Sequence, residues 1–203
     1  MAPRNTEPAP GVYPIDTGTA ELSASGSGWL VCINGAESSH IDPDHPERLD
    51  FEYMRQMALI VEERFSSAPR PPRALHLGAA TCALPRYLDH RFPGARQVAV
   101  EIDAALAAYA REWFDLPRAP ALRIRVGDAR AVVDQVRGEQ IVVAENQVDR
   151  PDRRLQPLGR GQQHLAGVDG AAVAATAGTN AEMYSIADGI ANKLFVAYAA
   201  YTK

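Results

Sequence analysis

Two patterns of apolar residues alternate along the middle of the chain, and their order predicts its strands and helices. Short apolar runs cover residues 74–78, 97–103 and 122–130. Between them, apolar side chains recur every three or four positions over residues 81–91 and again over 106–113. Runs of the first kind predict buried strands, and patterns of the second kind predict helices. Because parallel strands need a crossover, usually a helix, this order predicts a parallel α/β unit.

A hairpin and a helix are predicted before this unit. Residues 29–33 and 36–41 are strand-like and are separated by Asn34-Gly35. This dipeptide is a strong hairpin signal, because both central residues of the tight turn need positive φ. Residues 46–65 then place apolar side chains on one helical face, with Pro46 suited to the first turn. The preceding residues 1–27 are rich in Pro, Gly, Ser and Thr, so we expect a flexible arm there.

After the third strand the pattern becomes weaker. Residues 129–136 predict a helix, and residues 141–145 a fourth strand. Residues 147–170 have little apolar periodicity and predict a loop. Small residues fill 171–178, and an apolar stripe over 183–198 follows a capping-box pattern and predicts a C-terminal amphipathic helix. These strands are fewer than a complete sheet uses, so we expect an open edge beside the fourth strand, where a second copy could pair in a homodimer.

Composition and charge exclude several classes of partner. Hydrophobic residues make up 46% of the chain and charged residues 23%, as in soluble globular proteins. The net charge of −4 creates no basic field, so we expect no nucleic-acid partner. No apolar run is long enough to span a bilayer, and the N-terminus has no apolar signal segment. Cys32 and Cys82 form no spacing motif. By elimination, we expect a cytoplasmic protein without a membrane partner.

Three residues with chemical potential fall at successive strand ends, namely Gly78, Glu101 and Asp128. Ligands of parallel sheets bind outside the carboxyl ends of the strands. Glu101 lies 23 positions beyond Gly78, near the spacing at which an acidic residue accepts hydrogen bonds from ribose hydroxyls. Asp128 could accept a hydrogen bond from an adenine amine. Taken singly, Gly78 could be only a turn, and Glu101 with Asp103 only a helix cap.

The loop after the first strand narrows the choice of cofactor. It reads GAATCA over residues 78–83 and contains one glycine rather than the three of a dinucleotide-binding loop. Pyrophosphate binding is therefore poorly supported. A cofactor that carries only adenosine and an amino-acid tail fits this loop better.

Metal-ligand residue types also occur after the hairpin, at His40, Asp42, Asp44 and His45. Their spacing matches no established metal site. We therefore expect a solvated turn there and no metal.

Five segments of the chain resemble the spermidine synthase-like family. They read LVCINGAESSHID (30–42), LDFEYM (49–54), ALHLG (74–78), VEID (100–103) and GDAR (127–130). The resemblance covers about residues 28–145, and the C-terminal part does not match. An unrelated tail from a reading-frame change or a fusion is one hypothesis for the rest.

This resemblance implies a fold, a cofactor and a site. The fold is α/β, with a Rossmann-like parallel sheet of the class I S-adenosylmethionine methyltransferase type, an N-terminal β-hairpin and a truncated or altered C-terminus. Members of the family transfer an aminopropyl group from decarboxylated S-adenosylmethionine to putrescine. Here Glu101 would hold the ribose and Asp128 the adenine of that donor or of S-adenosylmethionine. The implied cofactor-binding residues are Gly78, Ala79, Glu101, Ile102, Asp128 and Ala129.

The chain departs from the family pattern around the acceptor. Ser38 stands where the family has glutamine, and Tyr53-Met54-Arg55 replaces a Tyr-His-Glu element. Glu145 stands at the end of the fourth strand, where the family has its catalytic aspartate, and is the candidate base that deprotonates an amine. Its extra methylene shifts the carboxylate by about 1 Å, enough to cost roughly 100-fold in rate. Arg55 in place of an acid would repel a diamine.

Two functions stay open at this point. One is a transferase that passes an aminopropyl or methyl group to an amine or another small acceptor. The other is a catalytically degenerate protein that keeps the fold as a binding or interaction module. The expected organisation is a flexible arm (1–27), a β-hairpin with a helix (28–68), a Rossmann-like nucleoside-binding core (69–146), and an atypical loop with an amphipathic helix (147–203).

Overall fold

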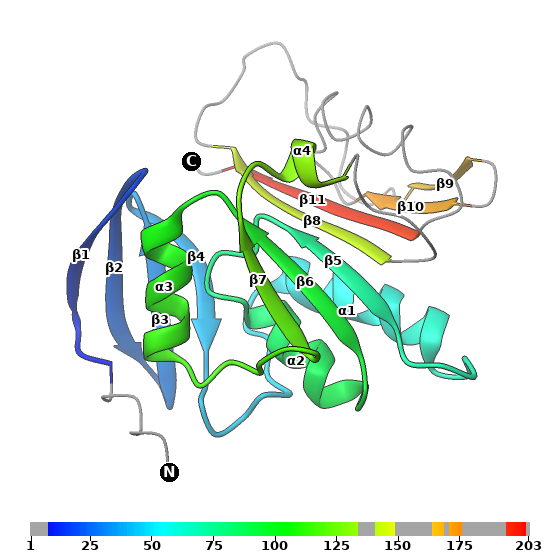
Figure 1. The fold of residues 1–203 in the computed structure, drawn as a ribbon, viewed down its shortest axis with the longest axis horizontal. Coiled ribbons are helices and arrows are strands. Elements are labelled where there is room, and N and C mark those ends of the chain that lie inside the picture. Colours follow the sequence, from blue (N-terminus) through cyan, green and yellow to red (C-terminus); the bar gives the residue numbers. More distant parts are fainter. Residues whose placement is uncertain (1–7, 134–140, 149–163, 169–170, 176–193, 202–203) are drawn as a thin grey trace.

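The computed structural model describes residues 8–133, 141–148, 164–168, 171–175 and 194–201, and these form two sheets (Figure 1). The smaller sheet has four strands in the order β1-β2-β3-β4, and every neighbouring pair is antiparallel. The larger sheet has the order β7-β6-β5-β8-β11-β10-β9. Helix α3 (Ala104–Trp113) lies between the two sheets and contacts β1 as well as β6 and β7.

The N-terminal sheet contains the predicted hairpin and one more. Strands β3 (Gly28–Ile33) and β4 (Ala36–Ile41) are joined by Asn34 and Gly35, whose φ values are +52° and +82°. The Asn-Gly hairpin is therefore confirmed. Strands β1 (Gly11–Ile15) and β2 (Gly18–Ser25) precede it.

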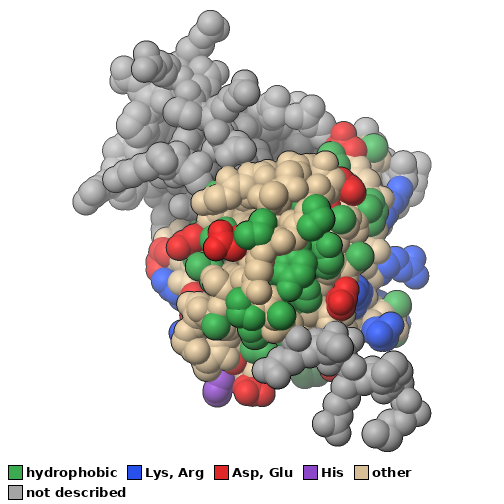
Figure 2. Space-filling model, turned by 90° about the vertical axis from the view of Figure 1, so that its left-hand side faces the viewer, with side chains coloured by type: hydrophobic (Ala, Val, Ile, Leu, Met, Phe, Trp, Pro, Cys, Tyr) green, Lys and Arg blue, Asp and Glu red, His purple; other side chains and the backbone are tan. Residues whose placement is uncertain are grey.

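The expectation of a flexible arm over residues 1–27 is wrong for β1 and β2. Pairing with β3 and burial of alternate side chains, such as Ala20 and Leu22, hold this segment in place. Figure 2 shows the side of the molecule formed by β1 and β2, where apolar side chains gather at the centre with acidic side chains around them. One of the apolar residues that β1 leaves exposed is Val12.

Helix α1 (Glu52–Phe65) is shorter than the helix predicted from Pro46. The backbone between β4 and α1 forms turns instead, with His45 N donating to Asp42 O and Arg48 N to His45 O. The side chain of Asp42 reinforces the first turn by accepting from Asp44 N at 3.1 Å. Local side-chain bonds of this kind compete with a helix.

The predicted parallel unit is present in the larger sheet. Strands β5 (Arg73–Leu77), β6 (Arg96–Glu101) and β7 (Leu122–Val126) pair in parallel. Helix α2 (Ala83–Arg91) connects β5 to β6, and α3 connects β6 to β7. Short helix α4 (Ala129–Val133) follows β7, and the rest of the helix predicted to residue 136 lies outside the described residues. The core includes fully buried leucines from strands and helices alike: Leu75, Leu84, Leu88, Leu106 and Leu122.

The C-terminal part differs from its prediction. Strand β8 (Ile141–Val148) lies between β5 and β11 (Leu194–Tyr201), and it is parallel to both. The predicted open edge beside this fourth strand, which was the reason to expect a homodimer, is therefore wrong. Strand β9 (His164–Val168) occupies part of the predicted loop, and β10 (Ala171–Ala175) occupies the small-residue tract.

The C-terminal helix prediction is wrong for residues 194–198, which belong to β11, and its remainder over residues 179–193 lies outside the described residues. Strand β11 reads LFVAYAAY and lies between two neighbours in the sheet. A short continuous apolar run suits a strand inside a parallel sheet better than an amphipathic helix. The fold class predicted from the sequence, a parallel α/β sheet altered at its C-terminus, is confirmed. None of the helices in the described part of the chain has the length and apolar character to cross a bilayer.

Candidate functional site

The loops that follow β5 and β7 are both attached to the end of β6. Gly78 N and Ala79 N donate to Val100 O at 3.0 and 3.2 Å. Gly127 N donates to Glu101 O at 2.9 Å. These backbone bonds bring the three predicted strand ends together, because Asp128 directly follows Gly127. The carboxyl edge of β5, β6 and β7 therefore carries the predicted residues as one group.

The carboxylate of Glu101 links the loop after β5 to the residues that follow β6. Its Oε2 accepts from Ala80 N at 2.9 Å, and its Oε1 accepts from Asp103 N at 3.1 Å. The side chain is buried, and burial raises the pKa of Glu101 although these backbone N–H groups oppose the rise. An ionised carboxylate offers about four lone-pair sites. Acceptor capacity therefore remains for further donors such as ribose hydroxyls.

The loop between β5 and α2 has an unusual backbone. Gly78 has a φ of +75°, and two non-glycine residues, Ala80 and Cys82, have φ values of +44° and +66°. Positive φ is costly for residues with a Cβ, and such strain collects at ligand-binding and catalytic sites. Thr81, between these two residues, is fully buried, and its hydroxyl has no hydrogen-bond partner. This strained loop is the one whose Ala80 N donates a hydrogen bond to Glu101.

The remaining cofactor-binding candidates surround this point. Ile102 directly follows Glu101 and is 63% exposed, so its side chain is accessible to a ligand. Asp128 is exposed, and its carbonyl accepts from Val132 N at the start of α4, which Ala129 opens. An exposed apolar side chain and an exposed carboxylate that follow neighbouring strand ends suit an adenine ring and its exocyclic amine.

The helix-cap alternative holds for Asp103 and not for Glu101. Asp103 is the N-cap of α3, and its Oδ1 accepts from Leu106 N at 2.8 Å. Glu101 instead accepts from Ala80 N in the loop after β5 and from Asp103 N, which precedes the first residue of α3. The sequence alone does not separate the roles of these two acids, and the structure does.

The prediction that the fourth strand ends at Glu145 is wrong, because β8 continues to Val148. Glu145 lies one position beyond the residue that pairs with the end of β5. The register joins Leu77, the last residue of β5, to Ala144, so Glu145 directly follows the last pair between the two strands. This places the candidate base on the same edge of the sheet as the other candidate residues.

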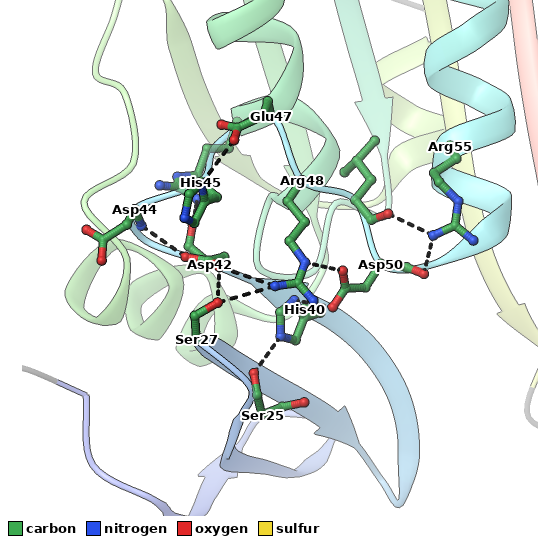
Figure 3. Close-up of polar contacts among 12 residues, drawn as sticks. Ser25, Ser27, His40, Asp42, Asp44, His45, Glu47, Arg48, Asp50 and Arg55 are labelled. Atoms are coloured by element: carbon green, nitrogen blue, oxygen red, sulfur yellow. Dashed lines mark hydrogen bonds and ion pairs between the residues drawn. The ribbon is translucent and has the colours of Figure 1, made fainter.

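The segment between β4 and α1 is held by a polar network that the sequence did not reveal (Figure 3). His40 contacts Asp50 Oδ2 through Nδ1 at 2.9 Å and Ser25 O through Nε2 at 3.0 Å. Asp42 accepts from Ser27 Oγ at 2.5 Å, and Arg48 lies 3.5 Å from the same carboxylate. The hydrogen bond from Ser27 is the largest influence on Asp42 and lowers its pKa.

The two histidines among the candidate metal ligands have different side-chain partners. His45 pairs with Glu47, whereas His40 contacts Asp50 and Ser25 O. Over the described ranges, no group of three or more His, Cys, Asp or Glu side chains is placed to hold a metal ion.

Arg55 is tied to the segment before its own helix. Its Nη1 donates to Leu49 O at 2.9 Å and to Asp50 O at 2.5 Å, and its Nη2 pairs with Glu52 at 2.6 Å. This arginine therefore anchors the start of α1. Ser38, another departure from the family pattern, is buried in β4.

No protein-family model matches the chain, and no curated protein matches it. Among solved structures, a probable spermidine synthase from Corynebacterium glutamicum is 38% identical, with a TM-score of 0.64 over 68% of this chain and 52% of that chain. The chain is similar to spermidine synthases. The resemblance predicted from the sequence is thereby confirmed, and the chain spans about half the length of this relative.

Two more distant structures also match. The spermidine synthase from Thermotoga maritima is 16% identical, with a TM-score of 0.47 over 66% of this chain and 45% of that chain. A SAM-dependent methyltransferase from Agrobacterium tumefaciens is 17% identical, with a TM-score of 0.42 over 62% of this chain and 41% of that chain.

Proposed function

We propose that the chain is a spermidine synthase-like transferase that binds S-adenosylmethionine or its decarboxylated form at the carboxyl edge of β5, β6 and β7. The observation that carries the proposal is the position of Glu101, whose buried carboxylate joins the loop after β5 to the end of β6. Similarity to a probable spermidine synthase supports the same reaction class.

Each residue of the edge has a role in this proposal. Glu101 accepts hydrogen bonds from the ribose hydroxyls, and Asp128 accepts one from the adenine amine. Ile102 and Ala129 pack against the adenine. Gly78 and Ala79 form the turn that lets the backbone approach the rest of the donor closely.

The transfer itself is a substitution at carbon. A nitrogen of the acceptor attacks the carbon next to the sulfonium, the new C–N bond forms, and the C–S bond breaks with its electron pair going to sulfur. The proton that leaves the nitrogen passes to a base, for which Glu145 is the candidate. With the decarboxylated donor the second product is methylthioadenosine, and with methyl transfer it is S-adenosylhomocysteine.

Arg55 favours a second candidate function, a protein that binds the nucleoside without aminopropyl transfer. Its guanidinium is fixed by two carbonyl groups and Glu52, at a position where the family has an acid. A fixed cation there disfavours a diamine acceptor. A binding or interaction module therefore stays as the alternative.

Calorimetric titration with S-adenosylmethionine, its decarboxylated form and methylthioadenosine tests the proposal. We expect binding of at least one, and a loss of roughly 10- to 100-fold in affinity for Glu101→Ala, because hydrogen bonds to a charged acceptor are lost. Glu63→Ala removes an exposed carboxylate from α1 and serves as the matched control. No heat from any of the three ligands would rule out the nucleoside site.

A product assay with putrescine then separates the two candidates. Formation of spermidine and methylthioadenosine supports aminopropyl transfer. Tight donor binding without this product supports methyl transfer to another acceptor or the binding module.

A further inference from the structure

The turn between β1 and β2 is fastened to the start of α3, far along the chain. Thr17 donates to Asp103 Oδ2 twice, through its backbone N at 2.7 Å and its Oγ1 at 2.8 Å. The neighbouring Asp16 accepts from Ala104 N at 2.9 Å through its Oδ2. The N-terminal sheet therefore reaches the residue that lies two positions beyond Glu101.

Asp103 transmits this contact to the proposed nucleoside site. It is 1% exposed, and its two carboxylate oxygens are divided between Leu106 N and Thr17. With the side chain fixed from both sides, its backbone N–H is directed at Glu101 Oε1. The other oxygen of Glu101 holds Ala80 in the strained loop. A continuous series of hydrogen bonds thus runs from the hairpin turn to the loop after β5.

The hairpin itself is anchored at a second point on the same helix. The ring of Tyr13 in β1 lies 5.4 Å from that of Tyr109 and 4.9 Å from that of Trp113, between ring centroids. Tyr109 and Trp113 stack on each other at 4.8 Å with nearly parallel planes. Aromatic pairs at these separations add stability beyond their buried area. With both ends of α3 contacted, the turn at Thr17 is held against Asp103.

We infer that Thr17 is a positioning residue for the nucleoside site. Thr17 fixes the side chain of Asp103, and the backbone N–H of Asp103 in turn fixes the carboxylate of Glu101. This inference rests on the proposed function for its ligand. A binding carboxylate must be held close to its productive orientation by residues around it, because a free side chain loses rotamer entropy on binding. The segment that reads as a flexible arm in the sequence is thereby part of the site.

Three variants of the hairpin separate positioning from simple stabilisation. Thr17→Val keeps the shape and the backbone donor but removes the hydroxyl, and Thr17→Ser restores the hydroxyl. Thr19→Ala, an exposed change two positions away in β2, is the matched control. Each variant is compared with the wild type by backbone amide hydrogen exchange, followed by NMR, and by affinity for methylthioadenosine and its 2′-deoxy analogue.

The exchange measurement tests the positioning without any ligand. We expect faster exchange of the Ala80 and Asp103 amides in Thr17→Val, at unchanged exchange of core amides in β5, and recovery in Thr17→Ser. Equal exchange in wild type and Thr17→Val would overturn the inference.

The affinity measurement tests whether the positioned Glu101 carboxylate recognises the ribose hydroxyls. We expect the wild type to prefer methylthioadenosine over its 2′-deoxy analogue, and Thr17→Val to lose roughly 3- to 10-fold of this preference, the effect of one hydrogen bond. An unchanged preference with a lowered melting temperature would mean a merely structural role and overturn the inference. Absence of binding in the wild type would instead overturn the proposed function, while the exchange result still decides whether Thr17 holds Glu101.

Discussion

Replacing Asp103 with alanine tests the hydrogen-bond network at the start of α3 most directly. The change removes the acceptor for Leu106 N, which is the N-cap bond of the helix, and for both donors of Thr17. It leaves the backbone of Asp103, and so its bond to Glu101, without the side-chain contacts that fix it. The expected effect is a loss of stability that exceeds the loss of an ordinary cap.

The magnitude follows from the three bonds. Loss of an N-cap costs about 1 kcal/mol. Hydrogen bonds to a charged acceptor contribute about 1.5–3 kcal/mol each, and the two from Thr17 fall at or below the lower end because Thr17 is exposed and water replaces the acceptor. Together these predict a decrease of about 2–4 kcal/mol in the free energy of unfolding. With a urea slope of about 2–3 kcal/mol per molar, the midpoint falls by roughly 1 M.

Urea unfolding followed by circular dichroism measures this change, with Asp115→Ala as the control because it removes an exposed carboxylate outside the network. Asp103→Asn keeps one carbonyl oxygen for Leu106 N but turns an amide toward the donors of Thr17. We therefore expect its free energy of unfolding to lie between those of the wild type and Asp103→Ala. A decrease below about 1 kcal/mol for Asp103→Ala would refute the reasoning, since a single cap then accounts for the whole effect.

The same network predicts a pH dependence. Burial on its own would raise the pKa of Asp103, and the hydrogen bonds from Leu106 and Thr17 outweigh it, so that this pKa is lowered. The stabilisation is fully present above the pKa of the unfolded carboxyl, about 3.9, and is lost as the pH falls through the lower folded value. The stability difference between the wild type and Asp103→Ala is therefore expected to shrink below about pH 4.

Two further predictions concern stability. His76 is fully buried, and burial lowers its pKa to about 4 from 6.5. Between pH 6.5 and pH 4, His76 binds a proton in the unfolded chain but not in the folded chain. The free energy of unfolding therefore decreases by about 3 kcal/mol as the pH falls through this range. Urea midpoints across this range should depend less on pH in His76→Leu. Gly28→Ala would place a Cβ 2.5 Å from Ile41 O, and we expect a loss of about 1–3 kcal/mol by thermal unfolding. In the control Gly11→Ala, the atom nearest to the new Cβ belongs to the ring of Tyr13, at an ordinary contact distance of 3.5 Å. A comparable loss in this control would contradict the steric reason.

The strands and strand ends of the central unit could be predicted because their signals are local. An apolar run that closes in Gly78 or Glu101 marks a buried strand and its exit in a few residues, and Asn34-Gly35 fixes a hairpin by its turn conformation alone. The three strand ends then meet because parallel strands present their carboxyl ends at one edge. Nothing in these steps depends on distant parts of the chain.

The first hairpin could not be predicted with equal ease, because its second strand, β2, contains few large side chains. Within β2, the buried positions are Ala20 and Leu22, and Thr19 and Glu21 on either side of Ala20 are exposed. This alternation is present in the sequence, but small and polar residues of this kind are also typical of loops. Likewise β11 is apolar throughout, so its apolar residues match a helical repeat as well as a strand.

The partner of Asp103 lies beyond any local pattern. Its cap on Leu106 N follows from a spacing of three residues. Thr17, in contrast, is 86 positions away and meets Asp103 where the hairpin packs on α3. A sequence pattern can therefore show that a carboxylate ends a strand or opens a helix, but not which other donors it receives. In this chain those donors decide whether Asp103 merely caps a helix or also holds the neighbouring Glu101, so the site has to be tested in the intact chain, with its N-terminal sheet present.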